Sequence, residues 1–248
     1  MQWTGDGIIL GCRRYGETSV ILELMTRMRG RHLGLVRGGR SRRHASLLQP
    51  GNGVRATWRG RLDEHLGSFQ VEAMVERAGR LMETALGLYG MTLLAAHLRL
   101  LPERDPHPAL HDAALVLVDA LHDPALAPAL MVRFELALLA ELGFGLDLDT
   151  CAATGSRDDL AYVSPRTGRA VSRGAGEPYR DKLYALPAFL TPDRIEHPSL
   201  GDVLDGFRLT GHFLDREVYA ARGLRLPEAR EGFINAVRRM AEPRHAAE

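Results

Sequence analysis

The densest group of side chains with binding chemistry in this sequence is a run of arginines. The segment VRGGRSRRHASLLQPGN, residues 36–52, carries four arginines within seven residues and no acidic residue: Arg37, Arg40, Arg42 and Arg43. A guanidinium group presents its N–H donors as a planar fork, which matches two phosphate oxygens and also stacks on bases. The segment therefore predicts a site for a polyanion, above all for a nucleic acid.

The basic residues of the whole chain are also concentrated in its N-terminal third. The net charge is only +1, yet residues 1–80 carry 14 arginines and 7 acidic residues, whereas residues 81–248 carry 18 basic and 24 acidic residues. Between Glu23 and Asp63 there are ten arginines and no acid. Lys182 is the only lysine, so a general preference for arginine explains arginine in place of lysine but not the missing acids. We favour contact with nucleic acid over a merely solvated basic face.

The arginines are expected to be positioned by strands. Five short runs rich in β-branched residues are separated by turns that contain glycine, and they predict strands over 5–14, 18–26, 31–38, 53–61 and 67–75. The segment SRRHASLL, residues 41–48, predicts a short helix between the third and fourth strands. This arrangement is typical of an OB-fold barrel, which binds single strands across one face and its loops. We therefore predict an OB-fold nucleic-acid-binding domain over residues 1–78.

The fourth run predicts a second basic surface. In GVRATWRGR, residues 53–61, the apolar Val54, Ala56 and Trp58 alternate with polar residues. One face of this strand is expected to be apolar and the other cationic. Trp58 falls on the apolar face, which favours a place in the core over a role in stacking on bases. The cationic side chains of the other face and its continuation are Arg55, Arg59 and Arg61.

Beyond Val75 the pattern changes to that of helices. Apolar residues on broad faces predict helices over 80–101, 108–122 and 128–143, an apolar stripe from Leu200 to Val218, and a last helix over about 227–241. Residues 145–190 interrupt the helices as an insertion rich in glycine, serine and arginine. The predicted fold class is α+β, with an N-terminal five-stranded barrel followed by a mainly α-helical domain over residues 79–248.

The sequence contains no recognisable catalytic motif. A P-loop needs a lysine after its glycines, and the lone Lys182 lies instead in YRDKLY. No G-x-S-x-G nucleophile motif is present. His107 and His111 have the spacing of metal ligands on one helix face, but prolines flank His107, so we favour the start of a surface helix. We expect no enzyme activity and no cofactor.

The same composition predicts a cytoplasmic protein without membrane contact. No stretch approaches the roughly 18 apolar residues of a membrane span, and the N-terminus lacks a basic segment followed by an apolar run. The two cysteines, Cys12 and Cys151, do not make a disulfide framework, which favours a reducing compartment.

The insertion carries the spacing of a zinc ribbon without its ligands. Cys151 and Thr154 have C-x2-C spacing, and Ser172 and Ala175 repeat it after seventeen intervening residues. Four cysteines in these positions would be a strong zinc signature. Threonine, serine and alanine supply no thiolate, so we expect a degenerate, metal-free version of a zinc-ribbon-like insertion.

Several segments together resemble the RecO family of bacterial recombination mediators. They are GIILGCRRYGETSVILELMT, GLVRGGRSRRHASLLQPG, FELALLAELGFGLDLDTC and YVSPRTGRAVSRGAGEPY, in this order along the chain. The resemblance implies an OB-fold followed by a helical domain, often with a four-cysteine zinc site. This sequence departs from that site at Thr154, Ser172 and Ala175.

The resemblance also implies a function. RecO-like proteins bind single- and double-stranded DNA, anneal complementary strands, and act with RecR and the single-stranded DNA-binding protein to help load RecA. It implies a nucleoid-associated location in the cytoplasm. An RNA- or ribosome-associated OB-fold protein is the alternative that the residues themselves leave open.

A site for a protein partner is expected in the helical half. The C-terminal tail of single-stranded DNA-binding protein is acidic with an apolar end, so it needs an apolar surface rimmed by arginines. Three arginines lie beside the Leu200–Val218 stripe and are the candidates: Arg216, Arg222 and Arg225. The alternative is that they pair with neighbouring acids such as Asp215 and Glu217.

Overall fold

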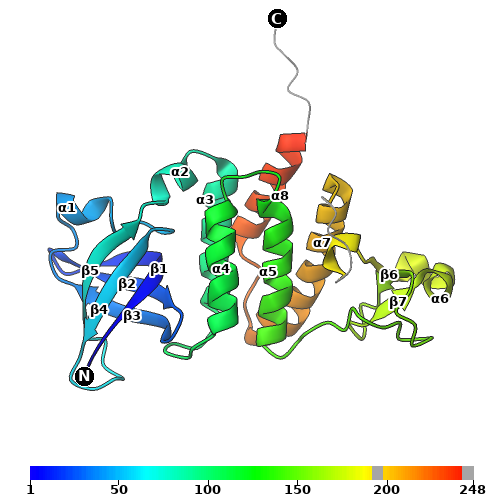
Figure 1. The fold of residues 1–248 in the computed structure, drawn as a ribbon, viewed down its shortest axis with the longest axis horizontal. Coiled ribbons are helices and arrows are strands. Elements are labelled where there is room, and N and C mark those ends of the chain that lie inside the picture. Colours follow the sequence, from blue (N-terminus) through cyan, green and yellow to red (C-terminus); the bar gives the residue numbers. More distant parts are fainter. Residues whose placement is uncertain (192–197, 242–248) are drawn as a thin grey trace, which may run out of the picture. The chain divides into compact units, whose positions relative to one another are not determined.

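The computed structural model describes residues 1–191 and 198–241 (Figure 1). By its internal contacts the chain divides into two compact units, Met1–His122 and Asp123–Glu248. The first unit contains a five-stranded sheet and the helices that follow it. The second contains a small three-stranded sheet together with longer helices. The expected α+β class, with strands first and helices after them, is confirmed.

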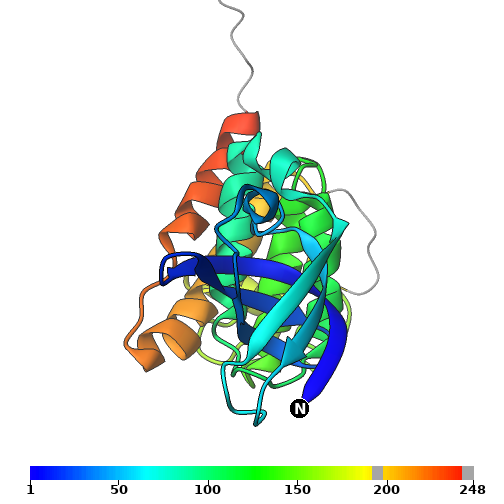
Figure 2. The same cartoon turned by 90° about the vertical axis from the view of Figure 1, so that its left-hand side faces the viewer.

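The five expected strands are all present, and they close into a barrel (Figure 2). Neighbouring strands follow the order β1-β2-β3-β5-β4, and β4 pairs with β1 to complete the circle. The pair β3–β5 is parallel and the other four pairs are antiparallel. A short helix, α1, lies between β3 and β4 as expected. The bounds are β1 Gln2–Tyr15, β2 Ser19–Thr26, β3 Gly30–Val36, α1 Arg42–Ala45, β4 Gly53–Arg59 and β5 Ser68–Val75.

Strand β1 is long enough to pair with two neighbours. Residues Gln2 to Ile8 pair with β4, and residues Gly7 to Tyr15 pair with β2. The register with β2 shifts between Ile9 and Gly11. Such a bulge bends a strand and increases its twist, which allows one strand to serve both sides of a closed barrel.

The middle of β1 and most of β2 are buried on both faces. The barrel interior is filled by one apolar cluster: Ile9, Val20, Leu22, Leu24, Val36, Leu48, Val54, Ala56, Trp58 and Phe69. On the opposite face of the same two strands, Ile8, Ile21 and Met25 are also buried, and Ile8 lies directly opposite Met25. An antiparallel strand with one face in water alternates apolar and polar residues, and β2 does not. The part of the outer face of β1 and β2 that holds Ile8, Ile21 and Met25 is therefore not open to a ligand, whereas the end of β1 beyond Gly11 is exposed.

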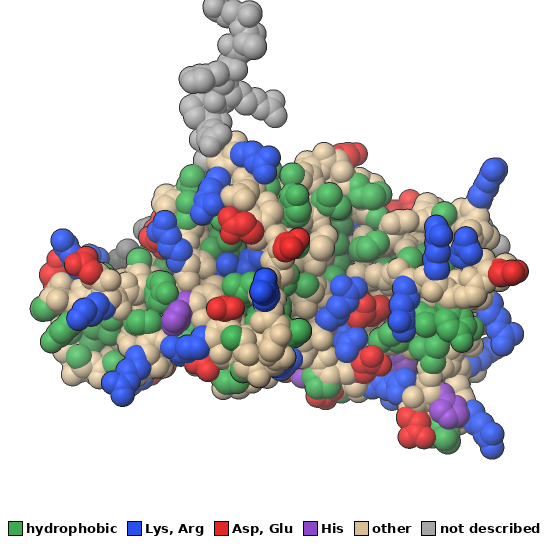
Figure 3. All heavy atoms as spheres, turned by 180° about the vertical axis from the view of Figure 1, so that it is seen from behind, with side chains coloured by type: hydrophobic (Ala, Val, Ile, Leu, Met, Phe, Trp, Pro, Cys, Tyr) green, Lys and Arg blue, Asp and Glu red, His purple; other side chains and the backbone are tan. Residues whose placement is uncertain are grey.

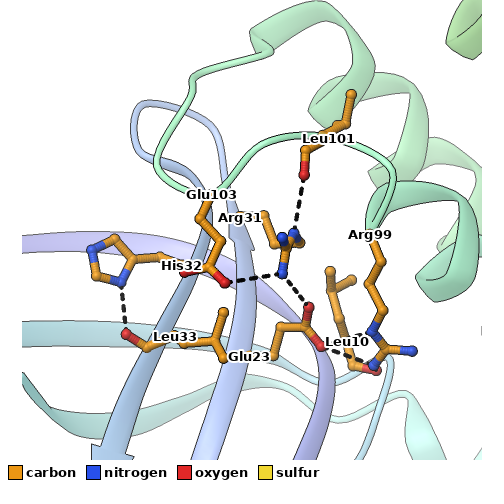
Figure 4. A network of polar contacts seen from close by, with 8 residues as sticks. All are labelled: Leu10, Glu23, Arg31, His32, Leu33, Arg99, Leu101 and Glu103. Atoms are coloured by element: carbon orange, nitrogen blue, oxygen red, sulfur yellow. Dashed lines mark hydrogen bonds and ion pairs between the residues drawn. The ribbon is translucent and has the colours of Figure 1, made fainter. Parts of the chain in front are cut away.

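A polar network fastens this outer face to the segment that follows helix α3 (Figure 4). The Glu23 carboxylate is shared by two arginines, at 3.0 Å from Arg31 Nη1 and 2.8 Å from Arg99 Nη2. Arg31 Nε also donates to the Leu101 carbonyl at 3.3 Å, and Arg99 Nη2 donates to the Leu10 carbonyl at 3.4 Å. The side chains of Glu23 and Arg31 are only 13% and 15% exposed. Removing either partner would leave a poorly hydrated charge, which is costly.

The first unit extends beyond the barrel because these helical segments pack on it. Gly30, at the start of β3, has φ +59°, and a Cβ atom there would lie 1.9 Å from the carbonyl oxygen of Asp105. Only glycine fits such a close approach. The boundary expected from the sequence, after residue 78, marks the change from strands to helices. The first compact unit extends further, to His122. The helices of this unit are α2 Ala78–Met82, α3 Ala85–Leu98 and α4 Pro108–Ala120.

The second unit places a three-stranded sheet, of order β7-β6-β8, within the expected insertion. Helix α7 continues into a π-helical turn over Leu214–Tyr219. No helix among the described residues combines the length and apolar composition needed to cross a membrane. The bounds are α5 Ala127–Glu141, β6 Leu160–Val163, β7 Ala170–Ser172, α6 Arg173–Gly176, β8 Tyr184–Ala185, α7 Leu200–Phe213 and α8 Glu228–Ala241.

A buried ion pair joins three helices of the second unit. Arg230 of α8 donates from Nε to Glu135 Oε1 at 2.8 Å and from Nη2 to Oε2 at 3.0 Å. Its Nη2 also donates to the Phe207 carbonyl of α7 at 2.7 Å, and the Thr210 hydroxyl donates to the Glu135 carboxylate. Glu135 is fully buried in α5. Because both oxygens of Glu135 and two nitrogens of Arg230 have partners, the cost of dehydrating the pair is largely offset.

One histidine lies among the aromatic side chains of the barrel. The ring centroid of His32 is 5.1 Å from that of Trp3 and 5.3 Å from that of Trp58. Its Nδ1 lies 2.9 Å from the Leu33 carbonyl oxygen. Burial lowers the pKa of His32 to about 4, because a charged imidazolium would lose its hydration there.

We predict that His32 makes the barrel less stable as the pH falls from about 6.5 towards 4. The unfolded chain protonates this side chain below about pH 6.5, whereas the folded barrel resists protonation until about pH 4. In that window protons favour the unfolded state, by roughly 1–3 kcal/mol at its acid end. Urea denaturation at about pH 7 and about pH 4.5, followed by tryptophan fluorescence, measures the loss.

The His32→Leu variant serves as the control, because it keeps an apolar side chain of similar size without a titrating group. Its free energy of unfolding should fall less between the two pH values than that of the unmodified protein. An equal fall in both proteins would show that His32 does not cause the effect.

Candidate nucleic-acid interface

The arginine segment begins where β3 ends and is held against the turn between β1 and β2. The backbone N–H of Arg40 donates to the Thr18 carbonyl at 3.0 Å, and its guanidinium donates to the Glu17 carbonyl. His44 Nδ1 lies 3.1 Å from the Gly38 carbonyl oxygen, which braces the loop before α1. Arg37, Arg40 and Arg42 are exposed, and the side chain of Arg43 lies outside the described part of the structure.

Two further arginines lie beside this segment. Arg13 and Arg14 precede the β1–β2 turn, opposite Ile21 and Val20 of β2, and both are exposed. The pairing of β1 with β2 places these two arginines next to the β1–β2 turn. The pairing of β2 with β3 then brings that turn close to the arginine segment after β3. We define the arginine rim as these two residues and the exposed arginines of the loop: Arg13, Arg14, Arg37, Arg40 and Arg42.

The arginine rim carries positive charge that no acid compensates. None of its five guanidinium groups forms an ion pair with an acidic residue in the part of the chain that the structure describes. Glu17, the nearest acid along the chain, offers Arg40 its backbone carbonyl. Like charges gathered at one end of a barrel attract anions through their summed field.

The strand face of β4 is different, because its neighbours supply acids. Arg55 lies between Asp6 of β1 and Glu72 of β5 in the register. Its Nε is 2.8 Å from Asp6 Oδ1 and its Nη2 is 3.2 Å from Oδ2, and this hydrogen bonding lowers the pKa of Asp6. Arg59 donates to the Gln2 side chain at 3.1 Å. The expected alternation is present, but across the sheet the face is close to neutral.

The long acid-free stretch of sequence is likewise not acid-free in space. Arg27 Nε lies 3.1 Å from Asp112 Oδ1 of α4, and Arg31 contacts Glu23 and Glu103. Figure 3 shows basic and acidic side chains interspersed over one face of the molecule. Arg61 lies in the β4–β5 loop, exposed, two residues before Asp63 and three before Glu64. The count of arginines in the sequence thus overstates the local excess of charge, and the rim is a place where an excess remains.

Family models for both halves of a known protein match this chain. The model described as "Recombination protein O N terminal" matches residues 1–77, and "Recombination protein O C terminal" matches residues 82–225. The chain belongs to the RecO family. Curated RecO proteins, each named DNA repair protein RecO, are similar to it over almost their whole length. That of Methylobacterium nodulans is 63% identical over 94% of this chain and 97% of its own length.

Further RecO relatives give the same result. The protein of Rhizobium etli is 58% identical over 98% of this chain and 95% of its own length. The protein of Mesorhizobium japonicum is 57% identical over 99% of this chain and 97% of its own length. The resemblance drawn from the four sequence segments is confirmed.

In this RecO family member the degenerate zinc positions still converge. The buried Cys151 Sγ accepts the Ser172 N–H at 3.2 Å and lies 3.4 Å from Ser172 Oγ. Burial alone would raise the pKa of the Cys151 thiol, but hydrogen bonds from Ser172 and Thr154 lower it to about 6. Ala175, in α6, offers no ligand atom. No group of three or more His, Cys, Asp or Glu side chains among the described residues could hold a metal, so these positions do not fit zinc.

Of the three arginines expected to bind a partner, Arg216 is engaged within its own unit. It forms an ion pair with Glu217, donates to the Pro165 carbonyl of the insertion, and lies with its guanidinium 5.1 Å from the centre of the Phe213 ring. It therefore helps to fasten the insertion to α7. Arg222 and Arg225 are exposed beyond the π-helical turn.

We predict that three cysteines would restore a zinc site in the insertion. The triple variant Thr154→Cys, Ser172→Cys and Ala175→Cys would complete four thiols with Cys151. In a tetrahedral site with Zn–S near 2.3 Å the sulfurs lie about 3.8 Å apart, close to the present 3.4 Å between Cys151 Sγ and Ser172 Oγ. Elemental analysis after dialysis should find about one zinc per chain.

Adding Cys151→Ala to the triple variant gives the control, which should lose most of this zinc because one thiolate is missing. A triple variant without bound zinc would show that the backbone no longer holds the four positions within reach of one ion.

Proposed function

We propose that this RecO family member is a non-enzymatic DNA-binding protein of recombinational DNA repair, which binds single- and double-stranded DNA and anneals complementary strands. The arginine rim carries this proposal, because it combines exposed guanidinium groups with the absence of acidic partners among the described residues. The name of the curated relatives, DNA repair protein RecO, supports it. We assign the barrel to the OB-fold, with residues 1–78 as the DNA-binding domain and residues 79–248 as the helical domain.

The rim would act on DNA through phosphates. Each guanidinium group binds phosphate oxygens in a bidentate manner and releases a counterion as it does so. Phosphate contacts carry no direct sequence information. Affinity should therefore depend strongly on salt and little on base sequence, as suits a protein that acts wherever DNA has been damaged.

Annealing follows from the same chemistry. Two complementary strands repel each other through their phosphates, and bound cationic groups reduce that repulsion. Because the rim contacts the backbone, the base edges remain available for pairing with the second strand. This role needs no bound nucleotide and no chemical step.

We further propose that protein partners bind away from the rim. RecR and the acidic tail of single-stranded DNA-binding protein would associate with this protein and together help to load RecA. Arg216, Arg222 and Arg225 are the candidates to meet such a tail. A nucleoid-associated location in the cytoplasm would follow from DNA binding.

We predict that the triple variant Arg37→Ala, Arg40→Ala and Arg42→Ala binds all DNA sequences more weakly. Each lost phosphate contact reduces the slope of log K against log salt by about 0.7 for single strands and about 0.9 for duplex. The slope should therefore become shallower by roughly 2 to 3. Fluorescence anisotropy across a salt series measures binding, and pairing of labelled complementary strands measures annealing.

The matched control is the double variant Arg55→Ala and Arg59→Ala on the charge-balanced face of β4. It should keep nearly the original affinity and slope. A folded rim variant with unchanged affinity and slope would remove the rim from the DNA site. Tighter binding of structured RNA than of single-stranded DNA by the unmodified protein would favour the RNA-associated alternative.

A further inference from the structure

Tyr15 is an exposed aromatic residue at the arginine rim. The first unit contains five aromatic residues. Trp58 and Phe69 belong to the barrel core, and Trp3 packs against that core. Tyr15 ends β1, directly after Arg13 and Arg14, and is 54% exposed. Within the described part of the chain its side chain makes no hydrogen bond and no ring contact. The fifth aromatic residue, Tyr89, lies on α3.

The strand register places a rim arginine on the same face as this ring. Tyr15 lies opposite Ser19 of β2. Arg13 shares its face, because residues two apart on a strand point the same way. Strand β2 in turn pairs with β3, whose last residue, Val36, lies opposite Val20 and directly precedes Arg37. Tyr15 thus has one rim arginine on its own face of β1, and the loop that carries three more begins next to the neighbouring strand.

The turn beyond Tyr15 is held in place. Gly16 has φ +61°, a conformation that glycine adopts at little cost. Arg40 binds the backbone carbonyls of both remaining turn residues, Glu17 and Thr18. A ring on a strand that leads into an already ordered turn loses little conformational entropy when it meets a ligand.

We propose that Tyr15 stacks on an unpaired base of a single strand whose phosphates lie along the arginine rim. This inference rests on the proposed function and adds a base contact to it. Every base has a π-face, so stacking tolerates any sequence. In a duplex the internal bases are already stacked on both sides and offer the ring nothing. Tyr15 is therefore the residue that distinguishes single strands from duplex at a surface whose arginines bind both.

The test compares Tyr15→Ala with Tyr15→Phe, which keeps the ring, and with Tyr89→Ala, which removes an exposed tyrosine outside the rim. Tyr15→Ala should weaken binding of single-stranded DNA roughly fivefold to 150-fold and leave binding of blunt duplex unchanged. Tyr15→Phe and Tyr89→Ala should bind both forms as the unmodified protein does. Tyr15→Ser replaces Tyr15→Ala if thermal melting shows that the alanine variant is unfolded.

An abasic oligonucleotide of the same length and charge identifies the contact. The unmodified protein and Tyr15→Ala should bind it equally, because no base is present to stack. Three results would overturn the inference: no loss with Tyr15→Ala, an equal loss with the abasic strand, or an equal loss with duplex. If Tyr15→Ala binds normally while the triple arginine variant does not, stacking is rejected and the proposed DNA-binding function stands.

Discussion

The shared carboxylate of Glu23 determines how the first unit can be used. It lies on the outer face of β2 and binds one arginine of the barrel, Arg31, and one from beyond α3, Arg99. The barrel by itself supplies only one of the two ion-pair partners of the Glu23 carboxylate. The same anchoring lies on the part of the outer face of β1 and β2 that holds Ile8, Ile21 and Met25, a surface that an open barrel would offer to a ligand. What remains exposed is the β4–β5 face and the end of the barrel, and of these the end carries the excess of positive charge.

Arginine serves two purposes in this unit, and the local supply of acids separates them. Arg27, Arg31 and Arg55 face carboxylates from other segments, where the guanidinium fork fixes geometry as well as charge. At the rim the same side chain is exposed and has backbone carbonyls rather than carboxylates nearby, as Arg40 shows. In a protein with a single lysine, the arginines that pair with carboxylates are thus distinguished from the exposed rim arginines by position and not by residue type.

The sequence is informative wherever local periodicity decides the outcome. The five strands, the helix after β3 and the helices beyond residue 80 follow from alternation, glycine turns and apolar stripes. The neutrality of the β4 face was not predictable, because Asp6 and Glu72 reach Arg55 only through the register of three strands. Arg13 and Arg14 were missed for the same reason. The extent of the first unit depends on contacts between residues some 70 positions apart, such as Arg31 and Leu101, which no local pattern reveals.

The late position of Arg99 in the chain has a consequence for synthesis on the ribosome. Strand β1 leaves the ribosome first, yet the strands close only after β5, and the last contact to Glu23 comes from a residue beyond α3. At about 5–20 residues per second, the stretch from the end of β5 to Arg99 needs roughly 1 to 5 seconds more. During that time the face that holds Ile8, Ile21 and Met25 lacks the segment that Glu23 anchors to it. A nascent chain of this family should be a client of chaperones that recognise apolar surface, until α3 has been made.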